Sequence, residues 1–347
     1  MTTSTPPGSA RPVLTDPAQL IVALPYLLGF TPADSLVLLG HRPPGTGIGL
    51  MLRADLPPRD LFAYQADALA PRFRGAVHVG VTAVVVGGRA EPGGGPPFAE
   101  FVAQLRRALD EHGQRLLHPL WTAAIEEDAP WACYRDDDCG GLLPDPRGTV
   151  IAAATTKAGL VSFPSREDVA ALLEPRSREA IVRRTVLLGR AAQPPWDTED
   201  EVAAAAAEVR AAFQRRRAGT GDLDDEQAVR LAHALTIKPV REACLALALP
   251  PGTEVALEAE GLWLSLVKEL PPPHRAEAAC LLAYTTLLRG EGALAGMALD
   301  NALEASSGHL LAQLLYAVWN RGTDPAKLAG LGAGSEVDLG LEDSGDG

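Results

Sequence analysis

Four polar side chains near two predicted strands are of types that could do chemistry together. Asp34 and Ser35 stand at the start of an apolar stretch, and Arg53 and Asp55 stand near the end of the next one. Side chains two residues apart on a strand point to the same face, so Arg53 and Asp55 should face one way. A carboxylate beside an apolar strand has to be hydrated, hydrogen-bonded or paired. A hairpin between the two strands would allow Arg53 to pair with Asp34.

Two interpretations of this cluster follow from its chemistry. In the first, Arg53 and Asp34 form a structural ion pair while Ser35 hydrogen-bonds a turn amide, because ion pairs also occur where no catalysis takes place. In the second, the four side chains line a cleft for a small polar or phosphorylated ligand, with the arginine holding an anion and a carboxylate acting as a general base. The structural interpretation is favoured, and the cleft is the candidate ligand-binding site.

The common catalytic and cofactor motifs are missing from the sequence. It has no Gly-x-Ser-x-Gly elbow, no Gly-x4-Gly-Lys-Ser/Thr phosphate loop, no Gly-x-Gly-x-x-Gly and no His-Glu-x-x-His. The glycine-rich loop 87–95 lies between a predicted strand and a predicted helix, but it lacks the lysine and the spacing of a phosphate loop. We interpret it as a surface connection. We therefore assign no catalytic residue and expect no cofactor.

An acidic segment with two cysteines has the composition of a metal site but not its spacing. Cys133 and Cys139 are further apart than the cysteines of a zinc pair, and no histidine pair follows them. A calcium loop that began at Asp136 would place Arg147 where a carboxylate is required. We interpret the segment as a solvated acidic turn and expect no metal site. The other two cysteines lie in alanine- and leucine-rich helices, where buried structural thiols are expected.

The first half of the chain alternates between strand and helix patterns. Predicted strands cover residues 35–40, 48–55, 77–86 and 115–125. Predicted helices cover residues 18–28, 58–73 and 98–112. This alternation indicates a mixed sheet with flanking helices. We expect an α/β domain over residues 12–190, after a disordered N-terminus at residues 1–11.

The second half of the chain lacks strand patterns. A proline-containing linker at residues 191–196 leads to an all-helical domain of helical hairpins, expected over residues 197–330. Ala317 follows Ala283 by the 34 residues of a tetratricopeptide repeat. This match is partial, and a solenoid needs about three repeats, so a compact helical domain that is tetratricopeptide-like in part is predicted. Residues 331–347 carry acids and no bases, which predicts a disordered acidic tail.

Charge and composition narrow the classes of partner. The chain has 31 basic and 44 acidic residues, a formal net charge of −13, which disfavours nonspecific binding to nucleic acid or to an anionic membrane. The one basic cluster that could form a nucleic-acid surface comprises Arg176, Arg178, Arg183, Arg184 and Arg190. No apolar run is long enough for a membrane span, and no signal peptide is recognisable, so a cytoplasmic protein is expected.

Several motifs resemble one known family. The segment LPYLLGFTPADSLVLL at residues 24–39, followed by RADLP at residues 53–57, resembles the N-terminal signature of the actinobacterial domain of unknown function family 4192. The similarity continues in WACYRDDDCGGLLP at residues 131–144 and spans roughly residues 14–321. Family members often carry adjacent cysteines in this second motif, whereas here Gly140 follows Cys139. The resemblance implies the extent of the domain and a bacterial cytoplasmic context, and it implies no activity.

These observations favour a non-enzymatic protein-interaction or regulatory module. Its helical domain would bind another protein or a second copy of the chain, because helical hairpins commonly present such surfaces. The alternative hypothesis is an enzyme or sensor that binds a small polar or phosphorylated ligand near Asp34, Ser35, Arg53 and Asp55. The two differ in geometry, because a ligand site requires these four side chains to converge, partly exposed, on a concave pocket.

Overall fold

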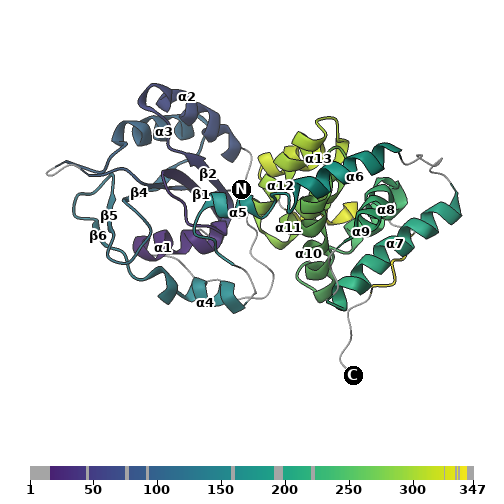
Figure 1. Ribbon diagram of the computed structural model, residues 1–347. Helices are drawn as coiled ribbons and strands as arrows, with labels where there is room; N and C mark the ends of the chain where they lie inside the picture. The colour runs from purple at the N-terminus through teal and green to yellow at the C-terminus, as the bar shows by residue number, and fades with distance from the viewer. Residues whose placement is uncertain are drawn as a thin grey trace. The chain divides into compact units, whose positions relative to one another are not determined.

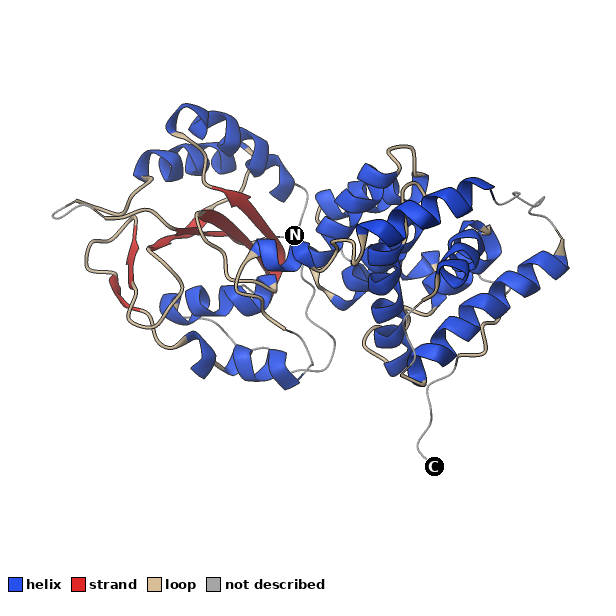
Figure 2. Cartoon of the chain, viewed as in Figure 1, coloured by secondary structure: helices blue, strands red, loops and turns tan. Residues whose placement is uncertain are grey.

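The chain divides into two compact units. A computed structural model describes residues 16–43, 47–74, 78–90, 94–157, 161–190, 198–219, 223–323, 325–332, 334 and 337–341. The first unit comprises Met1–Val169 and holds a sheet with helices, and the second comprises Ala170–Gly347 and is helical (Figure 2). This architecture confirms the predicted fold class. The expected N-terminal disorder at residues 1–11 and the expected linker at residues 191–196 lie outside the described residues.

The first unit contains a mixed six-stranded sheet in the order β2-β1-β3-β4-β5-β6. Its strands are β1 Ser35–Arg42, β2 Gly47–Asp55, β3 Gly80–Val86, β4 Leu116–Thr122, β5 Pro130–Cys133 and β6 Gly140–Leu142. Strands β3 and β4 are parallel, and every other neighbouring pair is antiparallel. The predicted β1–β2 hairpin is therefore confirmed. Strands β5 and β6 were not predicted, because β5 is short and β6 contains two glycines, which depart from the usual strand pattern.

Helices cover both faces of this sheet. Helices α2 (Phe62–Leu69) and α3 (Ala99–Glu111) lie on one face, and α1 (Pro17–Leu28) and α4 (Val150–Lys157) lie on the other (Figure 1). The short helix α5 (Arg166–Ala171) ends the unit. Helix α1 begins directly after Asp16, whose carboxylate accepts a hydrogen bond from the Ala18 amide at 2.9 Å. It continues through Pro25 to Leu28, the predicted end of this helix.

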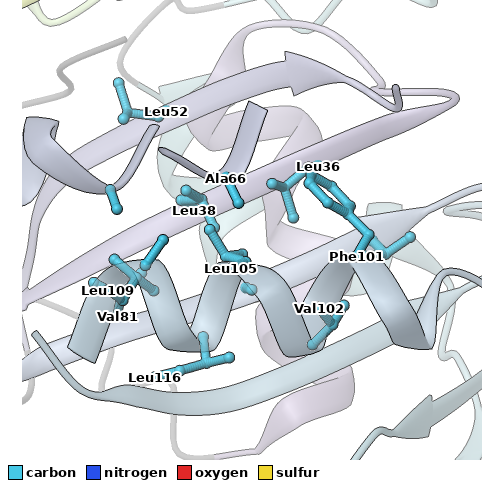
Figure 3. Close-up of a cluster of buried hydrophobic side chains, with 14 of the residues drawn as sticks. Leu36, Leu38, Leu52, Ala66, Val81, Phe101, Val102, Leu105, Leu109 and Leu116 are labelled. Atoms are coloured by element: carbon cyan, nitrogen blue, oxygen red, sulfur yellow. The ribbon is translucent and has the colours of Figure 1, made fainter. Parts of the chain in front are cut away.

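The core on the α2–α3 face is built from alternate strand residues and one stripe of each helix. Leu36 and Leu38 of β1 point toward Phe101 and Leu105 of α3 (Figure 3). Each of these four side chains is at most 1% exposed. Alternate residues of the strand and one face of α3 therefore form a single apolar layer. A shift of the strand by one residue would turn its apolar side chains away from this layer, so the layer fixes the register of the sheet.

The second unit consists of helices packed around α11. The helices are α6 Arg178–Arg190, α7 Glu199–Arg217, α8 Asp225–Thr236, α9 Lys238–Ala246, α10 Glu254–Glu269, α11 Arg275–Arg289, α12 Gly292–Ala305 and α13 Leu310–Asn320. Helix α11 contacts α8, α9, α10, α12 and α13, and it also contacts the short 3-10 helix Pro325–Leu331. Helix α6, expected in the α/β domain, packs against α8. Helix α7 begins with a capping box, in which Thr198 and Glu201 bond reciprocally.

The C-terminal segment is ordered where the structure describes it. Leu339 is 3% exposed, and Gly332 lies so close to the backbone of Ala246 that a Cβ atom there would stand 3.0 Å from it. Of the tail expected to be disordered, residues 331–347, the structure describes residues 331, 332, 334 and 337–341. Residues 342–347 lie outside the described residues.

Candidate functional site

Three of the four residues singled out in the sequence form one connected group at an end of the sheet. Ser35 stands opposite Asp55 on β2 and opposite Val86 on β3, and Val86 stands opposite Thr122 on the parallel strand β4. This places Ser35 and Asp55 beside the carboxyl ends of β3 and β4. Ligands of open α/β sheets bind outside the carboxyl ends of parallel strands, so the end of the sheet is a candidate site.

Arg53 is engaged by its own hairpin. Its Nε donates to Ser35 Oγ at 2.9 Å, and its Nη1 lies 2.6 Å from Asp55 Oδ1. Ser35 Oγ in turn donates to the Ala33 carbonyl at 2.6 Å. The Arg53 side chain is 12% exposed, and Ser35 is fully buried. The expected pairing of Arg53 with Asp34 is replaced by a pairing with Asp55, which lies on the same strand and faces the same way. The cation proposed to hold an anion is thus committed to a structural ion pair.

Asp34, the fourth residue, stands beside this group and faces solvent, as the Asp55 carboxylate also does. It is exposed, and its backbone has a φ of 43°, in the left-handed region that few non-glycine residues adopt. Its carboxylate lies over Gly87, where a Cβ atom would come within 2.6 Å of Asp34 Oδ1. Gly87 follows β3, and its carbonyl accepts a hydrogen bond from Trp121 Nε1 at 2.8 Å. The exposed Asp34 carboxylate therefore lies directly against the turn that follows β3.

The loops at this end of the sheet hold further unusual backbone. Within the described residues, three non-glycine residues have positive φ, namely Asp34, Phe98 and Asp128. Phe98 lies in the connection that follows β3, and Asp128 lies in the connection that follows β4. Left-handed residues often mark functional sites. The pattern could not be read from the sequence, because no motif encodes positive φ at a phenylalanine.

The structural interpretation of Arg53 leads to a prediction. Arg53→Met removes a charged donor from the buried Ser35 hydroxyl and should lower the free energy of unfolding of the first unit by about 1.5–3 kcal/mol. Asp55→Asn should cost less than about 1 kcal/mol, because the Asp55 side chain is 84% exposed. Hydrogen exchange of the slowest β3 amides measures both values. Equal losses for the two variants would contradict this assignment.

Three histidines gather at the opposite end of the sheet, a feature that the sequence analysis did not predict. His41 Nε2 lies 2.8 Å from Thr82 Oγ1, and Thr82 stands opposite His118 on β4. Burial, with His118 and His78 nearby, holds the pKa of His41 below its ordinary value of 6.5. Burial and the adjacent Arg42 also lower the pKa of His78. The first unit therefore disfavours the charged forms of the His41 and His78 imidazoles.

A pH dependence follows from these histidines. Since the folded state has the lower pKa, the unfolded chain takes up protons more readily as the pH falls below about 6.5, and this part of the stability is lost. Hydrogen exchange of the slowest β3 amides should therefore give a smaller free energy of unfolding for the first unit at pH 5.5 than at pH 7.5. His41→Gln should reduce the difference. A difference unchanged in this variant would show that His41 does not contribute.

The second unit contains a groove that the sequence analysis did not predict. Its cavity has a volume of about 240 Å³ and lies between the C-terminal part of α9, the connection to α10 and the start of α10. Residues 337–341 form one wall. Other lining residues are Ala243, Ala246, Leu247, Leu249, Pro250, Thr253 and Val255. The alternation of Val337, Leu339 and Leu341 within an acidic stretch was the one signal in the sequence.

The remaining candidates carry little chemistry. Burial raises the pKa of the Cys244 and Cys280 thiols, so both are poor nucleophiles, and their burial confirms the structural interpretation.

In the part of the chain that the structure describes, no three potential metal-ligating side chains gather. Part of the residues 87–95 loop lies outside the described residues. Among the described helices, none is long and apolar enough to cross a membrane.

The arginine cluster does not present a free basic surface. Arg183 and Arg184 both pair with Asp225, and Arg176 lies 3.4 Å from Glu269. Three of the five arginines considered for nucleic acid are thus neutralised by carboxylates. Paired arginines attract phosphate less, so the cluster gives a nucleic-acid surface little support.

Comparison with protein families gives a match over most of the chain. A family model described as a domain of unknown function, DUF4192, matches residues 17–326. No curated protein and no solved structure matches the chain.

Proposed function

The chain belongs to the family described as domain of unknown function DUF4192, and because that description names no activity, we propose from the geometry that it is a non-enzymatic protein-interaction module. The groove beside α9 carries this proposal, because a segment of the chain, residues 337–341, lines it and buries Leu339. Grooves between helices are a common place for the recognition of a polypeptide segment. All four cysteines are free, which supports a cytoplasmic site of action.

Affinity purification of the full chain from its native host, followed by mass spectrometry, tests the proposal. Leu247→Glu places a charge on the groove wall and serves as the matched comparison. We expect at least one protein that the wild-type chain retains and that the variant loses at least tenfold, and that binds again when both are purified. Identical sets of retained proteins would overturn the proposal.

A second candidate function is the binding of a small polar ligand at the carboxyl ends of β3 and β4. The exposed Asp34 carboxylate, held in a left-handed conformation over Gly87, favours it. Arg53 is tied to Asp55, so Asp34 and not Arg53 would make the contact. A metabolite that co-purifies with the wild-type chain and is lost from Asp34→Asn would support this function. A metabolite that both chains retain equally would exclude Asp34 from its binding.

A further inference from the structure

Two cysteines face each other across the β5–β6 hairpin at one edge of the sheet. Ala132 of β5 stands opposite Gly140 of β6, so the next pair along the hairpin is Cys133 and Cys139. The Cys133 amide donates to the Cys139 carbonyl at 2.8 Å, which shows that the two residues are aligned. Aligned residues of a hydrogen-bonded antiparallel pair have Cα atoms about 5.5 Å apart and side chains on one face. This separation lies within the range that a disulfide spans.

The two thiols interact with each other. Burial raises the pKa of the Cys139 thiol, and the neighbouring Cys133 thiol raises it further, in part through a hydrogen bond between the two side chains. The Arg135 amide donates to Cys133 Sγ at 3.5 Å, so this sulfur lies at the turn between the strands. Both sulfur atoms are therefore at the same end of the hairpin, within reach of each other.

The two sulfur atoms differ in their access to solvent. Cys133 is 8% exposed, whereas Cys139 is half-buried and follows the exposed aspartates of residues 136–138. A small oxidant therefore reaches Cys139 more easily, and Cys133 stands where a resolving thiol is needed. This arrangement of an accessible and a covered thiol is typical of a reversible dithiol.

The turn that carries the thiols is fixed to β4. The Tyr134 amide donates to the Pro119 carbonyl at 3.0 Å, and Arg135 Nη1 donates to the Leu117 carbonyl at 3.0 Å. Cross-strand pairs joined by a hydrogen bond have Cβ atoms farther apart than those of a relaxed disulfide. A bridge in an anchored hairpin would thus be strained, and strained disulfides are readily reduced.

We propose that Cys133 and Cys139 form a reversible disulfide, with hydrogen peroxide as the oxidant and a small thiol as the reductant. The Cys139 thiolate attacks one peroxide oxygen, the O–O bond breaks, and the hydroxide that leaves takes up a proton to form water. The Cys133 sulfur then attacks the sulfur of the Cys139 sulfenic acid, the S–O bond breaks, and a second water leaves. The two thiols thereby lose two electrons and two protons to the peroxide. Two molecules of a small thiol reverse the bridge by exchange and leave as their own disulfide.

Mass spectrometry of the full-length chain after exposure to hydrogen peroxide tests the inference. Free thiols are alkylated in denaturant before digestion with trypsin, which cuts after Arg135 and so separates the two cysteines. We expect peptides 116–135 and 136–147 to be joined in most molecules, and to be separate and alkylated after reduction with dithiothreitol. The buried Cys244 and Cys280 should be recovered alkylated in both samples. Absence of the joined peptides, or oxidation of Cys139 to a sulfinic acid while Cys133 stays free, would overturn the inference.

A displaced thiol separates the register of the hairpin from closeness in sequence. Cys139→Ser combined with Asp138→Cys keeps two cysteines in the turn but moves one of them away from the position opposite Cys133. In the folded chain we expect its disulfide to form about tenfold more slowly than that of the wild type, because the sulfur atoms are no longer aligned. In denaturant the two chains should react at similar rates. Equal rates in the folded chains would overturn the inference.

Asp136→Asn tests which sulfur the peroxide attacks. The substitution removes a negative charge that raises the pKa of the Cys139 thiol, and it keeps the Oδ1 atom that accepts from the Asp138 amide at 3.0 Å. A larger thiolate fraction should speed formation of the disulfide at pH 7 by about twofold. An unchanged rate would overturn the assignment of Cys139 as the sulfur that is oxidised first.

Discussion

Arg184→Met is expected to lower the free energy of unfolding of the helical unit by about 3–5 kcal/mol. Arg184 is 4% exposed and joins three parts of the unit. It pairs with Glu269 of α10, its Nε donates to Asp225 of α8 at 2.9 Å, and its Nη2 donates to the Leu223 carbonyl at 3.0 Å. Removing it leaves the nearly buried Glu269 carboxylate without its main partner, which is the costly step.

Two comparisons separate this effect from a general loss of charge. Arg183→Met removes an exposed arginine from the same Asp225 and should leave the stability nearly unchanged. Adding Glu269→Met to Arg184→Met removes the uncompensated carboxylate and should restore most of the loss. Hydrogen exchange of the slowest α10 amides reports all three values. A loss in Arg183→Met as large as that in Arg184→Met would contradict the assignment.

Gly87→Ala should lower the free energy of unfolding of the first unit by about 2–4 kcal/mol, from strained backbone and overpacking together. Gly87 has a φ of 117°, which a residue with a Cβ atom adopts only with strain. The added methyl group would also stand 2.6 Å from Asp34 Oδ1 and 3.1 Å from Asp34 Cα. The turn after β3 and the turn before β1 would have to separate.

The same loop offers a matched control for this substitution. At Gly95 a Cβ atom would meet nothing within 4 Å, and its φ is not in the left-handed region. Gly95→Ala should therefore change the stability by no more than about 0.5 kcal/mol. The slowest β3 amides give both values by hydrogen exchange. If Gly87→Ala were as mild as Gly95→Ala, the close approach of Asp34 to Gly87 would be disproved.

Local patterns predicted most of the fold. The valine-rich run that became β3 and the apolar run of β1 are strong strand signals, and Asp16 and Thr198 mark helix starts by their capping chemistry. Packing between distant segments has no such local signal. Helix α6 contains Val182 and Val186, which are exposed, while its Arg184 is buried by partners on α8 and α10. Composition alone therefore could not assign this helix to the helical unit.

The candidate sites were predicted only in part. The alternation of strand residues placed Arg53 and Asp55 on one face, and their 2.6 Å contact follows from it. The choice of Asp55 over Asp34 depended on the left-handed turn at Asp34, which a sequence does not specify. The groove depended on the C-terminal segment returning to α9. Burial of Leu339 favours this return, and the charge of the neighbouring acidic residues opposes it. The acidic composition of the segment predicted disorder instead.

The occupant of the groove can be identified directly by photocrosslinking in the cells that naturally make the chain. A photoreactive residue at Leu247 reports from the groove wall, and one at Leu257, which is 46% exposed on α10 outside the groove lining, is the control. We expect a link to residues 337–341 in part of the molecules and, in the rest, an adduct with a second protein that position 257 does not give. Intramolecular links alone, or the same adducts at both positions, would contradict a protein-interaction role for the groove.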